Sequence, residues 1–535
     1  MPNPSPQTID FYSFNVDTPV GYSLGVALLS EELKQRGHRV RLCLVDERVG
    51  LPWDVERLVA HSAEADPDVV ALSFASSHEP HARTLIGALA ERLPACRIVV
   101  GGVHPTIASE DVIRWPGVHA LGRGECDGLL ADFIDAWAAG DDAPAVPGFW
   151  VRRPNETILK NPQGPLPTLE GVAPLNADLD LRRIVRANRG IGNVAVTRGC
   201  PKRCSYCHNH TIRELYAKDL GRSVALKSFC RRRSVDDAIT ELLRLRRVTA
   251  GELRAINFDD DTLLTDRAWF FELARRIRDE VDLPYVMMGD VERIDEPLAR
   301  LLAETNCLLI KFGIESGSPR LRKERLHRGA SIDGVVPAFE LLHAHGVNAR
   351  SYVLVGVPTE IAEDVHKTFA LCGHSQTDSV RLAYLQPYVA TEIYDYCEAH
   401  GLFDPDAKHT SYFTGSPLRW PPAHSLLLEK MLHIHPWMTS AYLPENAAAD
   451  QYRALTDEVL AMDRAQWEAP KTLRWLRQTT LELDRDHRRA TIPHYLAPFP
   501  DRLDASFLVR RRRLPFPNVD DCWPPDAPWK DDPLP

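Results

Sequence analysis

Short apolar runs alternate with helix-period segments along two stretches of this chain of 535 residues, from residue 8 to 140 and from 191 to 400. Such alternation predicts parallel sheets wrapped by helices, because parallel strands need a crossover connection that is usually a helix. The first stretch contains two clear helix candidates, Gly25–Arg36 and His81–Arg92. Its five expected strands are Ile9–Phe14, Val40–Val45, Val69–Phe74, Ile98–Val100 and His119–Leu121. We therefore predict a doubly wound, Rossmann-type α/β domain over residues 1–140.

The second stretch has six strand candidates, with helix candidates between them. The strands are Val194–Thr197, Ala255–Phe258, Tyr285–Met288, Leu308–Phe312, Ala349–Val355 and Val380–Leu385. The helices include Ser234–Arg247, Asp266–Glu280, Pro297–Glu304 and Asp333–His345. Six βα units predict a partial, TIM-like (β/α)6 barrel over residues 191–400, with its chemistry at the C-terminal ends of the strands.

The remaining segments lack this rhythm. Residues 141–190 are rich in proline (PAVPGFW, NPQGPLPTLEGVAPL) and predict an irregular linker. Residues 401–535 predict a mostly helical region, and its last 22 residues hold seven prolines and five aspartates, which indicates an extended or disordered tail at 514–535. Aromatic residues in this region either line a pocket or form core, and their spacing favours core; they are His435, Trp437, Tyr442 and Trp467.

The overall charge gives no sign of a polyanion partner. The net charge is −10, from 64 basic and 74 acidic residues, so we expect no nucleic-acid binding. Two arginine runs, Arg231–Arg233 and Arg510–Arg513, are anion sites or solvated faces, and short runs favour a solvated face. No secretory signal and no apolar stretch of about 18 residues is visible, which predicts a cytoplasmic protein without a transmembrane segment.

Three of the eleven cysteines are clustered in the run VAVTRGCPKRCSYCHNH, directly after the first barrel strand. Cys200, Cys204 and Cys207 form a C-x-x-x-C-x-x-C loop, which can hold three corners of a [4Fe–4S] cube and leave one iron open to substrate. The alternative is a structural zinc site completed by His208 or His210. Zinc sites usually use paired C-x-x-C units, so the spacing favours the iron–sulfur cluster.

The loop RGCPKRCSYC resembles the cluster loop of the radical S-adenosylmethionine (SAM) superfamily. The resemblance implies that SAM chelates the open iron, that its reductive cleavage gives a 5′-deoxyadenosyl radical, and that the Tyr206 backbone lies near the adenine. It also implies an external one-electron reductant of the flavodoxin or ferredoxin type.

Three later segments resemble SAM-binding motifs of the same superfamily. FDDDTLLTDR is similar to the F-x-D-D-x-F-T pattern of cobalamin-dependent members, which implies that Asp260 and Asp261 meet the methionine ammonium. Leu263 and Leu264 depart from that pattern, and the alternative is an acidic N-cap cluster ahead of the helix at Asp266. KFGIESGS resembles the segment whose glutamate, here Glu315, binds the ribose hydroxyls. LVGVPTE resembles the turn beside the adenine, which places Gly356 there.

Residues 20–125 resemble the cobalamin-binding domain fused to this subclass, a flavodoxin-like sheet whose small residues accept the cofactor. The usual Asp-x-His-x-x-Gly signature is absent from this stretch, which implies base-off cobalamin without a histidine ligand. His104 as a ligand and a relic domain that no longer binds the corrin are the alternatives. The residues expected to contact cobalamin are Ser73, Ser76, Gly101, Gly102, His104, Thr106, Gly124 and Glu125.

Together the four motifs imply a cobalamin-dependent radical SAM C-methyltransferase that acts on an unactivated carbon of a biosynthetic intermediate, either a small molecule or a peptide. By this resemblance, one SAM methylates the cobalamin and a second gives the radical that abstracts hydrogen from the substrate. A cobalamin-fused radical cyclase or rearrangement enzyme is the alternative of the same class. A zinc-stabilised binding protein is the alternative of another class.

Overall fold

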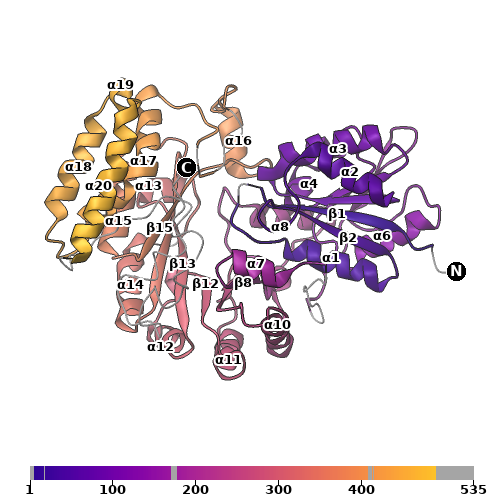
Figure 1. Cartoon of the computed structure of the whole chain (residues 1–535), viewed down its shortest axis with the longest axis horizontal. Helices are drawn as coiled ribbons and strands as arrows, with labels where there is room; N and C mark the ends of the chain where they lie inside the picture. Colours follow the sequence, from indigo (N-terminus) through magenta and orange to yellow (C-terminus); the bar gives the residue numbers. More distant parts are fainter. Residues whose placement is uncertain are drawn as a thin grey trace. The chain divides into compact units, whose positions relative to one another are not determined.

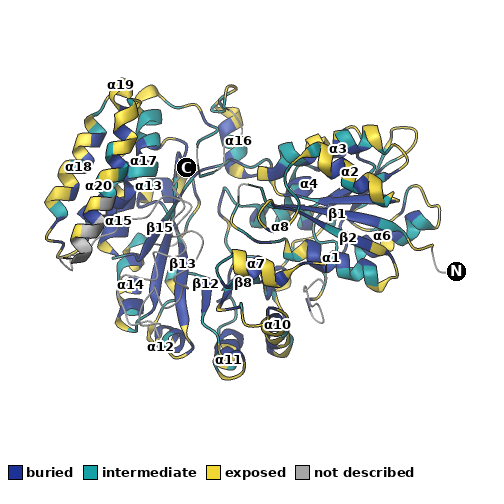
Figure 2. Ribbon diagram, in the orientation of Figure 1, coloured by how far each residue is buried: buried dark blue, intermediate teal, exposed yellow. Residues whose placement is uncertain are grey.

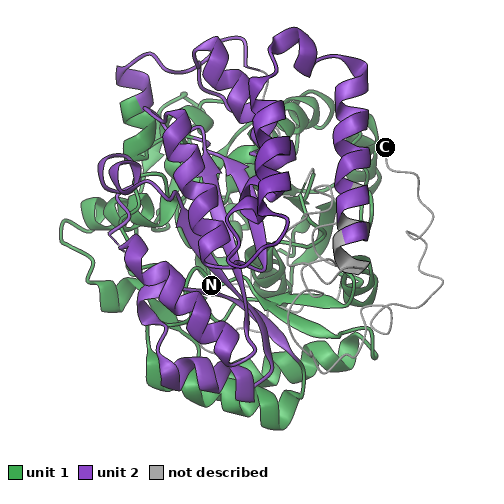
Figure 3. Ribbon diagram, turned by 90° about the vertical axis from the view of Figure 1, so that its left-hand side faces the viewer, with its two compact units in different colours: residues 1–283, 387–396 green, residues 284–386, 397–535 purple. Residues whose placement is uncertain are grey.

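The structure is a computed structural model that describes residues 5–16, 18–169, 178–329, 331–407, 412–413 and 415–489. The chain divides into two compact units, Met1–Leu283 with Pro387–Tyr396 and Pro284–Gln386 with Cys397–Pro535 (Figure 3). Figure 1 labels many of the helices and strands of both units. The predicted tail at 514–535 and the arginines at 510–513 lie outside the described residues.

The first unit begins with a seven-stranded sheet in the order β2-β1-β3-β4-β5-β6-β7. Its strands are β1 (Thr8–Phe14), β2 (Arg39–Val45), β3 (Val69–Ser73), β4 (Arg97–Gly101), β5 (Ala120–Gly122), β6 (Phe149–Arg152) and β7 (Ile158–Lys160). The pairs among β1–β5 are all parallel. The order 2-1-3-4-5 is that of flavodoxin-like sheets, whose ligands bind beyond the carboxyl ends of the strands. The predicted α/β class and the five expected strands are confirmed.

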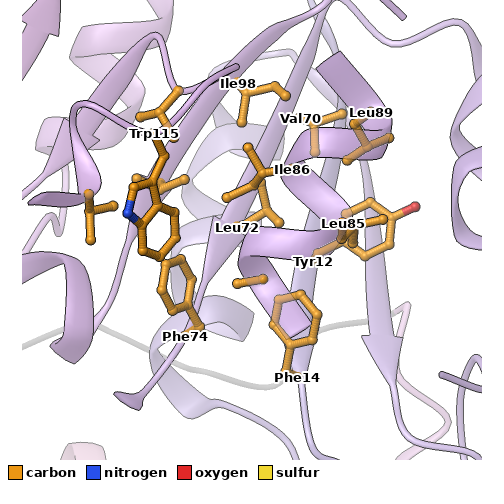
Figure 4. Close-up of a cluster of buried hydrophobic side chains, with 14 of the residues drawn as sticks. Tyr12, Phe14, Val70, Leu72, Phe74, Leu85, Ile86, Leu89, Ile98 and Trp115 are labelled. Atoms are coloured by element: carbon orange, nitrogen blue, oxygen red, sulfur yellow. The ribbon is translucent and has the colours of Figure 1, made fainter. Parts of the chain in front are cut away.

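Helices cover both faces of this sheet. They are α1 (Leu24–Gln35), α2 (Val55–Ala65), α3 (Glu79–Arg92), α4 (Val103–Ile107), α5 (Ser109–Val112) and α6 (Leu129–Ala138). Side chains alternate across each strand, so one face of β1 buries Tyr12 and Phe14 and the other buries Ile9 and Phe11. Figure 4 shows the first of these cores, where Leu72 and Ile98 of the sheet meet Leu85 and Ile86 of α3. The outer faces of α2 and α3 are exposed, as their amphipathic sequences require (Figure 2).

The segment expected as an irregular linker contains the antiparallel strands β6 and β7. The run Phe149–Val151 is aromatic and β-branched and is fully buried, so pairing with β5 extends the first sheet instead of leaving the segment irregular. The prolines of this segment flank the strands and do not interrupt them.

Six parallel strands form the half-barrel sheet, in the order β15-β14-β13-β12-β11-β8. The strands of the first unit are β8 (Ile191–Val194) and β11 (Ala255–Phe258). Those of the second unit are β12 (Tyr285–Gly289), β13 (Cys307–Glu315), β14 (Asn348–Val355) and β15 (Ser379–Tyr384). The predicted partial barrel is confirmed, although the first strand ends at Val194, where the sequence had placed its start. Residues Thr197–Arg198 instead form β9, which pairs with β10 (Arg231–Arg232) in a separate antiparallel ribbon.

Helices alternate with the barrel strands as predicted. They are α7 (Leu181–Ala187), α8 (His208–Asp219), α9 (Leu226–Phe229), α10 (Val235–Val248), α11 (Arg267–Arg276), α12 (Glu296–Glu304), α13 (Pro319–Glu324), α14 (Val335–Ala344) and α15 (Ala362–His374). A π-helical turn, Ile277–Val281, continues α11. Side-chain oxygens cap several of these helices, including Ser234 before α10 and Asp266 before α11.

The C-terminal region is helical in its described part. Its helices are α16 (Glu392–Ala399), α17 (Pro422–Ala441), α18 (Ala449–Ala461), α19 (Arg464–Trp467) and α20 (Pro470–Arg489). His435, Trp437 and Trp467 are buried core residues and Tyr442 is half-buried, which confirms the core interpretation for the first three. In the part of the chain that the structure describes, no helix is long and apolar enough to cross a membrane.

Candidate cofactor site

A cavity of about 660 Å³ opens in the first unit at the carboxyl ends of β1, β3, β4 and β5. Its lining continues along residues 195–199, which precede the cluster cysteines, and residues 259–261, which follow β11. The strand ends of two sheets within this unit therefore face one cavity. That is where doubly wound sheets and barrels both place their ligands.

Six of the eight residues expected at the corrin line this cavity, namely Ser73, Gly101, Gly102, Thr106, Gly124 and Glu125. Gly102 has a φ of +96°, and a Cβ there would lie 2.8 Å from the backbone N and O of Phe74. The loop after β4 therefore requires glycine at this position. Thr106 Oγ1 donates to the Gly102 carbonyl over 2.8 Å and accepts from the Gly124 amide over 2.9 Å, so it fastens the loops after β4 and β5 to each other.

His104 and Ser76 do not line the cavity. The His104 ring packs beside Phe74 and Trp115, with centroids at 5.8 and 6.2 Å, and its Nδ1 lies 3.0 Å from Ser76 Oγ. Burial lowers the pKa of His104 to about 4, which keeps the imidazole neutral. The geometry favours a structural role for this histidine.

Tyr22 is a cavity residue that the sequence did not single out. It lies on the loop between β1 and α1, and its hydroxyl is buried without a hydrogen-bond partner in the described structure. Burial raises its pKa, so the hydroxyl stays protonated and can donate. A buried orphan hydroxyl is costly unless a ligand satisfies it. Gly21 and the end of β1 at Phe14 are local signals that could have indicated this loop.

The three cluster cysteines lie on the loop between β9 and α8. Cys204 is buried and Cys200 and Cys207 are half-buried. Burial raises the pKa of Cys200 to about 11 and of Cys207 to about 12, and the charges of neighbouring cysteines raise both further. The three thiols are therefore neighbours, and those of Cys200 and Cys207 are protonated at neutral pH, so metal loading must displace their protons. Gly199, with a φ of +89°, turns the chain into this loop.

Among the described residues, no three His, Cys, Asp or Glu side chains gather as ligands of a single metal ion do. A tetrahedral zinc needs its ligands on one ion, whereas a cube distributes three thiolates over three irons. Of the two histidines proposed for zinc, His208 packs its ring 4.5 Å from that of Tyr388, with its Nε2 buried and without a hydrogen-bond partner in the described structure. His210 Nε2 lies 3.2 Å from Glu214 and 3.6 Å from Glu392. Three thiols on one short loop fit the cube better than the single ion.

Three aspartates follow β11, and the two expected at SAM, Asp260 and Asp261, have different surroundings. Asp260 is buried, and its Oδ1 accepts from Val196 N over 2.9 Å and from Thr197 Oγ1 over 2.6 Å. Its Oδ2 is buried without a partner in the described structure. Burial raises the pKa of Asp260 to about 7, against the opposing effect of these hydrogen bonds.

Asp261 lines the cavity beside the cluster loop. It is solvent-accessible, yet the surrounding atoms desolvate it enough to raise its pKa, while a side-chain hydrogen bond with Asn209 lowers it. Its charge in turn raises the pKa of Cys200 and Cys207. Both carboxylates are thus available to a cation in the cavity, and Asp260 also holds the start of the cluster loop.

Tyr206, also expected at SAM, lies half-buried on the cluster loop of the first unit. The second unit carries the remaining two residues, each at the end of a strand. Glu315 ends β13 with a φ of +63°, a strained conformation for a residue other than glycine, such as functional sites often retain. Gly356 follows β14 with a φ of +74°, and its amide donates to Glu360.

Comparison with protein-family models decides the identity of this chain. Residues 194–372 match the radical SAM superfamily model, and residues 16–134 match the B12-binding domain model. The chain is a radical SAM enzyme with an N-terminal B12-binding domain. This membership implies a [4Fe–4S] cluster, SAM and cobalamin as cofactors, and it replaces the alternative of a zinc-stabilised binding protein.

Known relatives of this radical SAM enzyme include methyltransferases. An uncharacterised methyltransferase of Pyrococcus horikoshii is 25% identical over 388 residues, 71% of this chain and 80% of that protein. The cytidylyl-2-hydroxyethylphosphonate methyltransferase of Streptomyces wedmorensis is 22% identical over 441 residues, 72% and 79% of the two chains. An anaerobic magnesium-protoporphyrin IX monomethyl ester cyclase of Rubrivivax gelatinosus is 20% identical over 337 residues, 61% and 58% of the two chains.

The fold is also that of a solved structure. The cobalamin-dependent SAM radical enzyme OxsB, with aqua-cobalamin and SAM bound, superposes with a TM-score of 0.63 at 13% identity, covering 94% of this chain and 78% of that one. The similarity in fold therefore extends beyond the barrel.

Proposed function

We propose that this enzyme is a C-methyltransferase that uses cobalamin and a SAM-derived radical to methylate an unactivated carbon of a small-molecule or peptide intermediate. The observation that carries the proposal is one cavity of the first unit that both parts of the site share. Loops from the B12-binding sheet and residues flanking the cluster loop line the same space. A methyl group that passes between SAM and a corrin needs both sites to open into one space, because reacting atoms must come within about 3–3.5 Å.

The residues divide the work of holding the cofactors. Cys200, Cys204 and Cys207 hold the cluster, and the carboxylates of Asp260 and Asp261 suit the ammonium of SAM. In the second unit, Glu315 and Gly356 are assigned to the ribose and the adenine. When bound, the cluster supplies an electron from an external one-electron reductant and the cobalamin carries the methyl group.

The loops of the B12-binding domain that line the cavity after β1, β3, β4 and β5 are called the corrin edge here. They carry small residues and the hydroxyl of Tyr22, which has no hydrogen-bond partner in the described structure. Gly101, whose Cβ would meet only the Gly122 carbonyl at 3.6 Å, leaves room for close approach of the ligand, and the hydroxyl of Tyr22 offers an unused hydrogen bond. Gly102 and Gly124 instead leave room for Phe74 and Tyr216. His104 would not hold the cobalamin, because its ring packs against Phe74 and Trp115 and does not line the cavity. The orphan hydroxyl and the open loops also favour a domain that still binds cobalamin over a relic.

The test is anaerobic reconstitution with iron, sulfide and hydroxocobalamin, followed by reduction in the presence of SAM carrying a labelled methyl group. We expect labelled methylcobalamin with S-adenosylhomocysteine, and 5′-deoxyadenosine with methionine. A variant with alanine at Cys200, Cys204 and Cys207 should lose iron and 5′-deoxyadenosine together. The matched control is Cys230→Ala, a nearby cysteine outside the loop, which should retain both.

A cyclase or rearrangement activity is the second candidate, since a cyclase is among the relatives. It predicts 5′-deoxyadenosine without labelled methylcobalamin or S-adenosylhomocysteine. That outcome would replace the methyltransferase proposal, and a wild-type protein that binds no hydroxocobalamin would support a relic domain.

A further inference from the structure

The loop 123–128, which follows β5 in the B12-binding domain, is joined to the cluster-bearing segment by an ion-pair network. Arg198, two residues before Cys200, is the centre of this network. Its Nη1 lies 2.5 Å from Glu125 Oε2 and 2.8 Å from Asp127 Oδ2, and its Nη2 lies 2.8 Å from Asp127 Oδ1. The contact with Asp127 is therefore bidentate, the geometry that best fixes direction as well as distance.

A second arginine completes the network from the neighbouring strand. The antiparallel register of β9 and β10 places Arg231 opposite Arg198. Arg231 Nη2 pairs with Glu125 Oε1, and its Nη1 donates to the Pro167 carbonyl over 2.6 Å. Both oxygens of Glu125 are thus engaged by arginines. The interpretation of Arg231–Arg233 as a solvated face is wrong for Arg231 and Arg233, whose side chains are 13% and 4% exposed. It holds for Arg232, which is exposed and pairs with Asp266.

Helix α8, which begins directly after Cys207, holds the same loop from the other side. Tyr216 accepts a hydrogen bond of 2.9 Å from the Glu125 amide, and its ring occupies the space that a side chain at Gly124 would need. Arg123 Nη1 pairs with Asp219 Oδ2 at 2.8 Å. The segments before and after the cluster loop are therefore both attached to one loop of the corrin edge.

The ion pairs of this network are largely shielded from solvent, so breaking one of them is costly in free energy. The side chains of Arg198, Glu125 and Asp127 are only 30%, 20% and 11% exposed, so loss of one partner leaves a poorly solvated charge. Two arginines face two carboxylates, which leaves no net charge for an anionic ligand. The ion pairs and hydrogen bonds of this network therefore fix the position of the loop after β5 relative to the cluster loop. Catalytic groups need to be held within about 0.5 Å of their productive positions.

We propose that Arg198, supported by Arg231 and Tyr216, is a positioning residue that sets the separation between the corrin edge and the cluster loop. It holds Glu125 and Asp127 on one side and leads into Cys200 on the other. We call the contacts of Arg198 and Arg231 with Glu125 and Asp127 the arginine clamp. Glu125 then binds the arginines of this clamp and does not contact the corrin. The inference rests on the proposed function in so far as cobalamin occupies the cavity.

The test compares two arginines of the first unit that are equally exposed and have two acidic partners each. Arg198→Met removes the clamp and keeps the apolar stem. Arg276→Met is the control, since Arg276 is 29% exposed and pairs with Asp236 and Glu280 away from the cavity. The readout is the magnetic interaction between cob(II)alamin and the reduced cluster in the full-length reconstituted protein, measured by pulsed EPR, together with bound iron and cobalamin.

For Arg198→Met we expect iron and cobalamin bound as in the wild type, a weakened and broadened cobalt–cluster interaction, and about tenfold less methylcobalamin per 5′-deoxyadenosine formed. Arg276→Met should match the wild type in the cobalt–cluster interaction and in the ratio of methylcobalamin to 5′-deoxyadenosine. An Arg198→Met protein with the wild-type interaction overturns the inference and leaves the proposed function intact. Wild-type protein that binds no cobalamin overturns both.

If Arg198→Met does not fold, Asp127→Asn tests the same contact, because it keeps the side-chain shape and removes one charge. The expected result is a smaller change in the cobalt–cluster interaction in the same direction. Asp127→Asn with an unchanged interaction and unchanged hydrogen exchange in residues 122–128 would overturn the inference.

Discussion

The carboxylate of Glu360 accepts a hydrogen bond of 2.6 Å from the amide of Gly356, four residues earlier in the chain. His424, near the start of α17, brings its Nε2 to 3.5 Å from the same oxygen and packs its ring on Trp420. A residue of the C-terminal region therefore supports the turn assigned to the adenine. No sequence motif indicated this contact.

Glu360→Ala should lower the free energy of unfolding by about 1–3 kcal/mol, because the buried Gly356 amide loses its acceptor. Glu360→Gln keeps an oxygen at this position and should stay within about 1 kcal/mol of the wild type. Urea unfolding followed by circular dichroism measures both. Equal losses in the two variants would mean that charge, and not the hydrogen bond, stabilises the turn.

Two adjacent glycines of the corrin edge should respond differently to alanine. Gly102→Ala places a Cβ 2.8 Å from the Phe74 backbone at a φ of +96° and should cost about 1–3 kcal/mol of folding free energy. Gly101→Ala meets only the Gly122 carbonyl at 3.6 Å and should change stability by about 0.5 kcal/mol or less, while its methyl group narrows the cavity. Thermal unfolding and absorbance titration with hydroxocobalamin separate the effects. If Gly101→Ala bound cobalamin as tightly as the wild type, the corrin would not lie against the loop after β4.

Tyr22→Phe should affect stability and binding with opposite signs. The unliganded protein should be as stable as the wild type or more so, because a buried hydroxyl without a partner is removed. Affinity for hydroxocobalamin should fall by about 2- to 12-fold, the effect of one hydrogen bond worth roughly 0.5–1.5 kcal/mol. An unchanged affinity would show that the hydroxyl does not face the cofactor.

The pKa of Asp260, raised by burial to about 7, predicts a pH dependence that Asp260→Asn should abolish. The folded protein holds this proton more tightly than the unfolded chain, so the contribution of Asp260 to stability is complete below the ordinary pKa of 3.8 and is lost as the pH rises to about 7. SAM binding should strengthen over pH 6 to 8 as the carboxylate forms. The asparagine keeps the acceptor for Val196 and Thr197.

Calorimetric unfolding from pH 4 to 8 and SAM titration at each pH check this prediction. Asp261→Asn is the control for stability, because Asp261 is solvent-accessible and its replacement should leave the unfolding curve within about 0.5 kcal/mol. A wild-type pH profile retained in Asp260→Asn would assign the titration to another group.

The sequence predicted the strands and helices because their signals are local. Alternating and helical periodicities show within ten residues, and β11 at Ala255–Phe258 has the predicted bounds. The linker prediction missed β6 and β7 because prolines surround the run Phe149–Val151, whose burial depends on pairing with β5. The tertiary partner, and not the composition of the segment, decided its conformation.

By itself, the sequence determined the class of chemistry, since three cysteines on one short loop and four ordered motifs need no knowledge of the fold. Only the tertiary structure divided the roles among the polar residues. It paired Asp260 with Thr197, 63 residues away, and Asp127 with Arg198, 71 residues away, and it buried His104 behind the cavity. Spacing along the chain reveals cluster-binding residues that lie close together in sequence, such as Cys200, Cys204 and Cys207. Hydrogen bonds and ion pairs between distant segments depend on how the sheets bring those segments together.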